Sequence, residues 1–219
     1  MDKLEYEFCS NVPVYKCSFC GKCSSFVEAT SYTRIKTRGC CWYFPKYSLI
    51  DIKNIIDSRN KDFIYSLLNM ENAEIHQYYI NVNGEFNKNE YEEYLKETLH
   101  EDSEASDFDQ KLFFRLCPFA TINGCRISFD LRPHPCNLYL CREVIDTCGK
   151  DYKELSKERK DYYSYCNYYS DTLKYALMDN NVDFVKDPFK SIEILEETEI
   201  SGFEFNTLKP IIFNSNLSY

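Results

Sequence analysis

Residues 151–180, DYKELSKERKDYYSYCNYYSDTLKYALMDN, carry apolar side chains at the spacing of one helical face. The expected inward-facing residues are Leu155, Tyr162, Cys166, Tyr169, Leu173 and Leu177. Apolar residues that recur every three or four positions predict a helix with one side in the core. We therefore expect a long C-terminal helix, within a helical extension (residues 151–219) that packs on the rest of the chain.

The chain before and after this helix alternates between strand-like and helix-like patterns. Extended segments are expected at residues 7–16, 26–35, 74–82 and 112–116, and as one or two closing strands within residues 202–213. The expected fold class is α+β, with a single compact domain over residues 1–219. In this fold, cysteine metal knuckles are expected to join the N-terminal and central segments.

A capped helix is expected to start at Ser48, because Asp51 follows it three residues later. The core-facing side of that helix would carry Leu49, Ile52, Ile55 and Ile56. Asn60 is expected to separate it from a second short helix. Both helices lie between the two cysteine-rich parts of the sequence.

The negative charge is concentrated in one place. The chain has a formal net charge of −9, and residues 85–109 contain ten acidic and two basic side chains. We read residues 85–110 as an acidic insertion with a solvated helix, whose apolar residues are Tyr91, Tyr94, Leu95 and Leu99, followed by a flexible linker from Glu101 to Asp109. The remainder has no basic stripe, so nucleic-acid binding is not expected, since a phosphate backbone requires clustered Lys and Arg.

Neither a secretory signal nor a membrane span is expected from the sequence. The N-terminus lacks an apolar run, and no stretch approaches the ~18 consecutive apolar residues typical of a transmembrane helix. A cytoplasmic protein is therefore expected. In a reducing compartment, grouped thiols favour bound metal over disulfides.

Nine of the twelve cysteines fall into two groups. The first group is Cys17, Cys20, Cys23, Cys40 and Cys41, and the second is Cys117, Cys125, Cys136 and Cys141. All nine are candidate metal ligands. Cys9, Cys148 and Cys166 are expected to be packing residues, and Cys148 lies about 10 Å along a helix from Cys141, too far to share one zinc ion.

The spacing Cys17-x-x-Cys20-x-x-Cys23 favours an iron–sulfur cluster, because repeated two-residue intervals can bring thiolates to one cluster. A plain Cys-x-x-Cys pair would favour zinc, and zinc stays open as the alternative. Cys40 and Cys41 are adjacent, so they could serve two centres, or one could be a packing residue. Nine thiols are one more than two four-thiolate sites require.

The second group surrounds the run Arg132-Pro133-His134-Pro135-Cys136. The two prolines restrict the start of any helix to the neighbourhood of Cys136, with Cys141 one turn further if both bind one centre. Arg132 is either a residue that offsets the negative charge of the cofactor or a salt-bridge donor. His134 could be a ligand, a proton donor or a turn cap.

These motifs resemble the YkgJ-type cysteine-cluster family. The resemblance rests on Cys17-Ser-Phe-Cys20-Gly-Lys-Cys23, on Gly124-Cys125-Arg-Ile, and on Arg132-Pro-His-Pro-Cys136 with Tyr139 and Cys141. It covers roughly residues 15–45 and 112–145, and it implies a zinc- or iron-chelating domain. Ser24 stands where family members often have a second adjacent cysteine. Flagellin lysine methylases are similar at the cysteine level, which implies a link to protein modification.

Three functions remain open at this stage. The first is an iron–sulfur protein for electron transfer, sensing, or a redox step in modifying a protein or peptide. The second is a zinc-stabilised module whose acidic segment docks a protein partner, and the third is a relative of the lysine methylases. Conventional kinases, dehydrogenases and hydrolases are not expected, because the sequence has no phosphate-binding glycine loop, dinucleotide fingerprint or nucleophile elbow.

Overall fold

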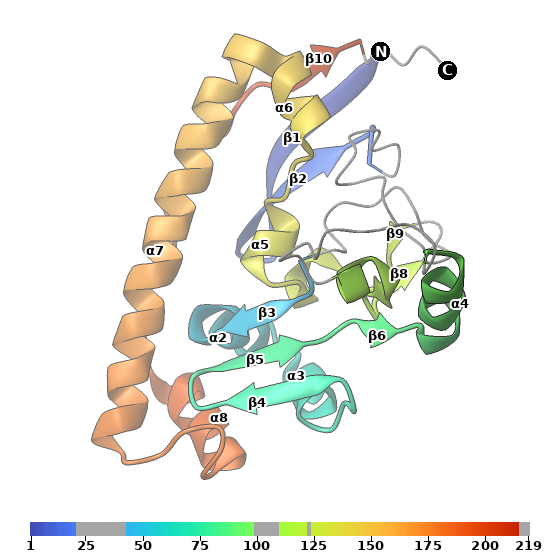
Figure 1. The fold of residues 1–219 in the computed structure, drawn as a ribbon. Coiled ribbons are helices and arrows are strands. Elements are labelled where there is room, and N and C mark those ends of the chain that lie inside the picture. The colour runs from blue at the N-terminus through green and yellow to red at the C-terminus, as the bar shows by residue number, and fades with distance from the viewer. Residues whose placement is uncertain (21–42, 99–109, 122–123, 215–219) are drawn as a thin grey trace.

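The computed structural model describes residues 1–20, 43–98, 110–121 and 124–214, and it has an α+β fold with a long C-terminal helix (Figure 1). The strands are β1 (Asp2–Cys9), β2 (Val12–Cys17), β3 (Lys46–Ser48), β4 (Ala73–His76), β5 (Tyr79–Val82), β6 (Glu85–Phe86), β7 (Arg115–Leu116), β8 (Ala120–Thr121), β9 (Gly124–Cys125) and β10 (Ile211–Phe213).

The helices complete the described part of the chain. The α-helices are α2 (Leu49–Asp57), α3 (Lys61–Leu68), α4 (Lys88–Thr98), α5 (His134–Asn137), α6 (Arg142–Cys148), α7 (Tyr152–Asp179) and α8 (Pro188–Glu197). Short 3-10 turns are η2 (Gln110–Phe114), η3 (Phe129–Leu131) and η4 (Gly149–Asp151). None of the described helices combines the length and apolar composition that crossing a bilayer requires.

Helix α7 confirms the expected long helix and runs along one side of the molecule, from the β10 end to α8 (Figure 1). Its buried residues include Leu155, Tyr162, Cys166, Leu173 and Leu177, whereas the sixth expected residue, Tyr169, is only half-buried. The buried stripe packs mainly on α2 and on α8. Burial of this stripe attaches the C-terminal part of the chain to the core.

The N-terminal sheet has the strand order β10-β1-β2. Residues 7–16 were expected to form one extended segment, and this is wrong, because the chain turns back at Ser10 and Asn11 to form the β1–β2 hairpin. These two residues have φ values of 49° and 67°. Two consecutive residues with positive φ are the signature of the turn that best joins twisted antiparallel strands.

A second sheet has the order β3-β5-β4. Residues 74–82 were expected to be one strand, and they instead form the β4–β5 hairpin with Gln77 and Tyr78 at the bend. The bend contains neither Gly nor Pro, so its sequence carries no turn signal. Strand β3 pairs with β5, and Tyr47 lies opposite Ile80.

Helix α2 begins as expected. Ser48 is its N-cap, and the backbone N–H of Ser48 donates to Oδ2 of Asp51 over 2.9 Å. The four predicted core residues, Leu49, Ile52, Ile55 and Ile56, are all buried. Asn60 precedes α3, also as expected.

The acidic insertion contains the expected helix, α4. Its Tyr91 and Tyr94 rings pack on Phe114, with ring centres 5.1 and 5.3 Å away. The expected strand at 112–116 is wrong for most of its length, because a 3-10 turn runs to Phe114 and only Arg115 and Leu116 pair, with β6. The expected extended segment 26–35, the linker 101–109 and Leu99 lie outside the described residues.

Candidate thiol site around Tyr47

The centre of the candidate site is the hydroxyl of Tyr47, on strand β3. The side chain is fully buried, and its ring packs edge-on against Phe63 at 6.0 Å between ring centres. Among the described residues, the Tyr47 hydroxyl has no hydrogen-bond partner. A buried hydroxyl without a partner is unfavourable by about 1–3 kcal/mol, so its persistence calls for an acceptor.

Three of the predicted ligands lie within electrostatic range of this hydroxyl. Burial raises the pKa of Tyr47 well above its ordinary value, and negative charge on Cys136, Asp51, Cys125 and Cys117 raises it further. The three thiols come from separate segments: one follows β7, one lies in β9 and one lies in α5. These three segments therefore place their thiols in the same region of the fold as Tyr47.

The β8–β9 hairpin sets the positions of two of these thiols. Ala120 lies opposite Cys125 in the hairpin, and its backbone N–H donates to the carbonyl of Cys117 over 2.9 Å. Gly124 has a φ of 131°, a conformation that a residue with a side chain rarely adopts. Thr121 donates through Oγ1 to the Gly124 carbonyl at 2.7 Å and closes the turn.

Cys136 lies in the short helix α5, which starts two residues earlier than the prolines suggested. Pro135 lies in its first turn, where a missing N–H is harmless, so the helix begins at His134. Cys141 is not one turn further along the same helix, as the expectation had it. The chain leaves the helical conformation after Asn137, and Cys141 occupies the N-cap position of α6.

A buried pair of side chains fixes the start of α5. Oδ1 of Asp51 accepts the backbone N–H of His134 over 2.8 Å and lies 2.9 Å from Nδ1 of its ring. Burial opposes ionisation of Asp51, but the charge of His134 and hydrogen bonds from His134 and Ser48 outweigh it and lower its pKa. The Nδ1 atom of His134 is therefore committed to Asp51, and the ring packs edge-on against Tyr163 at 4.8 Å.

Arg132 stabilises the turn before α5. Its Nε donates to the carbonyl of Ile127 over 2.8 Å, and its guanidinium lies 4.3 Å from the centre of the Phe129 ring. These contacts hold the η3 turn. A direct interaction of Arg132 with a cofactor stays a prediction.

The first cysteine group has a neighbour that the sequence analysis placed elsewhere. Cys17 is half-buried at the end of β2. Its pKa is raised to about 11, mainly by burial and also by negative charge on Cys20 and Cys148, against the lowering effect of a backbone hydrogen bond from Phe19. Cys148 is buried, as a packing residue should be, but it also lies near Cys17. Its distance along the sequence from Cys141 gave no hint of this, because the proximity arises where α6 meets the N-terminal sheet.

Six of the nine predicted ligands lie in the described residues, and Cys23, Cys40 and Cys41 lie outside them. No disulfide joins the described cysteines. Within residues 1–20, 43–98, 110–121 and 124–214, no three His, Cys, Asp or Glu side chains are placed to hold one metal ion. The described thiols therefore do not complete a metal site by themselves, and any such site needs additional donors.

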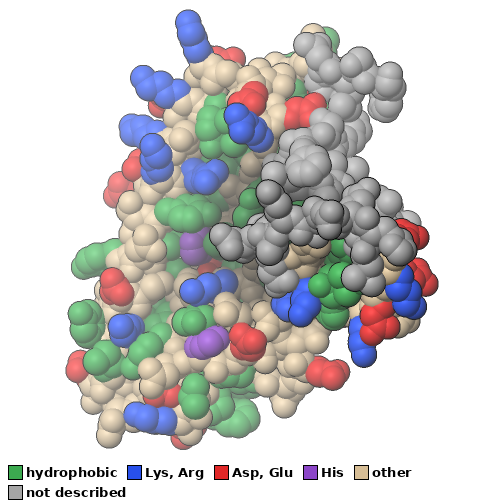
Figure 2. All heavy atoms as spheres, viewed as in Figure 1, with side chains coloured by type: hydrophobic (Ala, Val, Ile, Leu, Met, Phe, Trp, Pro, Cys, Tyr) green, Lys and Arg blue, Asp and Glu red, His purple; other side chains and the backbone are tan. Residues whose placement is uncertain are grey.

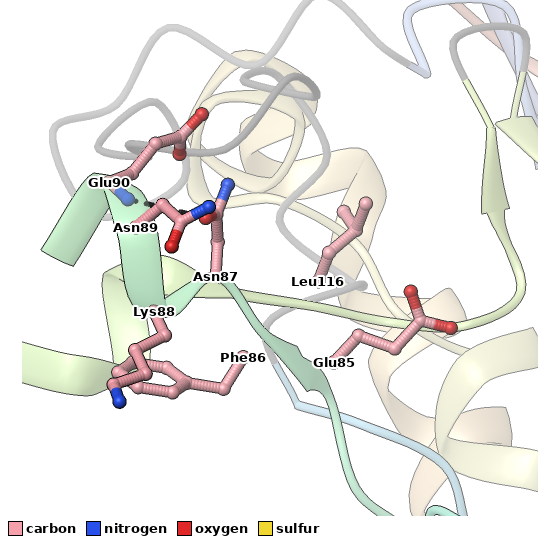
Figure 3. A pocket seen from close by; sticks show the side chains of 7 residues that line it. All are labelled: Glu85, Phe86, Asn87, Lys88, Asn89, Glu90 and Leu116. Carbon is pink, nitrogen blue, oxygen red and sulfur yellow. Dashed lines mark hydrogen bonds between the residues drawn. The ribbon is translucent and has the colours of Figure 1, made fainter.

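A further hollow lies at the start of α4 (Figure 3). It has a volume of about 540 Å³, and its lining is Glu85, Phe86, Asn87, Lys88, Asn89, Glu90 and Leu116. Asn87 accepts the backbone N–H of Glu90 through Oδ1 at 3.3 Å, which caps the helix. None of the described residues that line this hollow is a cysteine.

Comparisons of this chain with protein-family models, with characterised proteins and with solved structures found no match.

Proposed function

We propose that this chain is a metal-binding protein in which cysteine thiolates hold one or two iron–sulfur clusters. The observation that carries the proposal is the buried hydroxyl of Tyr47, which has no partner among the described residues and lies within electrostatic range of Cys117, Cys125 and Cys136. A thiolate is a strong acceptor for such an O–H group, whereas a neutral thiol is a weak one. Metal binding is what keeps a buried cysteine deprotonated.

The donor chemistry supports thiophilic metals in general, and the sequence spacing selects between them. Thiolate sets suit both iron–sulfur clusters and zinc. The third cysteine in step, Cys23 after Cys17 and Cys20, favours iron and sulfide. On the same residues we propose a relationship to the YkgJ-type cysteine-cluster family and a cytoplasmic redox, sensing or protein-modification role.

Metal and sulfide analysis tests this proposal on protein purified without oxygen. Iron and sulfide in near-equal amounts, with broad visible absorbance, are the expected result. Colourless protein with about one or two zinc ions per chain would instead make the thiols a structural zinc site. Folded protein that contains neither metal would contradict the proposal.

Two matched variants connect the result to the candidate site. Cys136→Ser removes a thiol that lies within electrostatic range of the Tyr47 hydroxyl, and it should lower the metal content. Cys9→Ser removes a half-buried thiol outside both cysteine groups and should leave the metal content unchanged. Equal metal content in the two variants would show that Cys136 is not a ligand.

A further inference from the structure

A second cavity is lined by Cys136 of α5 and by residues of β3 and α7. It has a volume of about 450 Å³, within the usual range for small-molecule sites. The residues that matter here are Lys46, Arg159, Tyr43, Tyr139, Tyr163 and Cys136. Among the described residues that line the cavity, none is acidic.

Two cations line this cavity, and aromatic rings rather than carboxylates hold them. Nζ of Lys46 lies 3.9 Å from the centre of the Tyr79 ring, and Cζ of Arg159 lies 5.6 Å from the centre of the Tyr163 ring. Arg159 also donates through Nη1 to the Tyr152 hydroxyl at 3.4 Å. In the described part of the chain, neither cation forms an ion pair.

The positive lining is unusual for the composition of this protein. The chain carries a net charge of −9, and seven of its sixteen described lysines pair with a carboxylate, whereas Lys46 does not. On the face drawn in Figure 2, Lys and Arg side chains gather over the upper half of α7. Two unpaired cations at one cavity produce a local positive potential that attracts an anion.

The aromatic residues of the cavity determine the rest of the ligand. The rings of Tyr43 and Tyr139 pack together with centres 5.6 Å apart, and Tyr43 is 67% exposed. Tyr163 contributes a third ring from α7. Rings of this kind bind a planar apolar group by stacking or edge-on contact.

We propose that this cavity binds a small aromatic anion, whose carboxylate or phosphate lies between Lys46 and Arg159. The planar part of the ligand packs against the tyrosines. The ligand would then lie beside Cys136, which lines the cavity. This proposal goes beyond the metal-binding function and does not depend on it, because the cations and rings belong to the protein itself.

Calorimetry with the full-length protein as purified tests the proposal directly. The probes are indole-3-acetate and phenyl phosphate, which separate a carboxylate site from a phosphate site. Indole-3-acetamide is the uncharged control, and acetate is the control without a ring. At least one aromatic anion should bind about one per chain, and both controls should bind at least about tenfold more weakly. Absence of binding by both aromatic anions, or equal binding of the acid and the amide, would overturn the proposal.

Substitutions locate the binding. Lys46→Gln and Arg159→Gln should each lower the affinity for the bound probe about tenfold, and Arg159→Lys should recover part of the affinity lost in Arg159→Gln. Lys160→Gln changes the net charge by the same amount at the next, exposed position of α7, and it should have no effect. Because Lys46 is exposed on β3, its variant should fold even if an Arg159 variant does not. An equal loss in Lys160→Gln would mean that only overall charge matters and would reject the site.

Metal analysis of the same samples keeps the two proposals distinguishable. Protein that binds the probe but contains no metal would support the proposed anion site and contradict the iron–sulfur proposal. Metal-loaded protein that binds neither probe would support the iron–sulfur proposal and contradict the proposed anion site.

Discussion

Oδ1 of Asp51 accepts the backbone N–H of His134 at 2.8 Å and also lies 2.9 Å from Nδ1 of the same residue. The Asp51 side chain is 3% exposed and that of His134 is 11% exposed. The other oxygen of Asp51 accepts the backbone N–H of Ser48 at the start of α2. One carboxylate thus fastens the start of α2 to the start of α5, two residues before Cys136.

Asp51→Asn should lower the free energy of unfolding by about 3 kcal/mol at neutral pH. The reason is that it removes one partner of a buried pair and leaves His134 uncompensated. Urea unfolding followed by circular dichroism measures this loss. The control is Asp146→Asn, because Asp146 is 67% exposed and pairs with Arg142 over 3.4 Å. A loss of no more than about 0.5 kcal/mol is expected for the control, and equal losses would contradict the role of Asp51.

The contribution of Asp51 should depend on pH in one direction. Because its pKa is lowered in the folded protein, the stabilisation is present above the unfolded pKa of about 3.9 and is lost as the pH falls through the folded value. The stability difference between wild type and Asp51→Asn should therefore shrink below about pH 4. A difference that stays constant from pH 7 to pH 3 would show that charge on Asp51 is not the cause.

If the proposed cluster is bound, Tyr47→Phe should weaken metal retention by about tenfold, because the variant cannot donate the hydrogen bond that the proposal assigns to a ligand thiolate. The measurement is competition with a chelator under anaerobic conditions. Tyr6→Phe is a matched control: its hydroxyl is also buried without a partner among the described residues, but its charged neighbours are Glu158 and Asp161 rather than thiols. Were Tyr47→Phe to stabilise the protein and leave metal retention unchanged, the hydroxyl would have no acceptor in the working molecule.

The α7 stripe allows a quantitative test of the fold. Leu173 is fully buried, so Leu173→Ala should lower the free energy of unfolding by about 3 kcal/mol. Tyr175, two residues further on, is 63% exposed, and Tyr175→Ala should change the stability by no more than about 0.5 kcal/mol. Denaturant unfolding of both variants tests the burial pattern, and similar losses would contradict the packing of α7 on α2 and α8.

The sequence predicts well those elements whose signals are local. The apolar stripe of α7 and the Ser48–Asp51 cap are periodic or positional patterns, and both are confirmed. The β4–β5 bend at Gln77 and Tyr78 has no turn residue, so tertiary pairing with β3 rather than local preference determines it.

The candidate site is likewise only partly predictable from the sequence. The sequence predicts Cys117, Cys125, Cys136 and Cys141 as one group from their type and spacing, but it does not predict that the Tyr47 hydroxyl lies near the first three. Tyr47 is one of 19 tyrosines in the chain, and no motif marks it. Its role follows from the place of β3 beside β5, which is a long-range contact. The proximity of Cys148 to Cys17 is equally non-local. Local sequence patterns therefore predict neither the position of Tyr47 nor this pair of cysteines.

The pairing of β1 with β10 has a consequence for how the molecule is made. Asp2 lies opposite Phe213, so β1 pairs with a strand that is synthesised more than 200 residues later. During synthesis the β1–β2 hairpin exposes an unpaired edge of β1 until β10 has been translated. Closure of this sheet is therefore a late step. A chain interrupted before β10 would present an open strand to its neighbours, which makes truncated products the most prone to self-association.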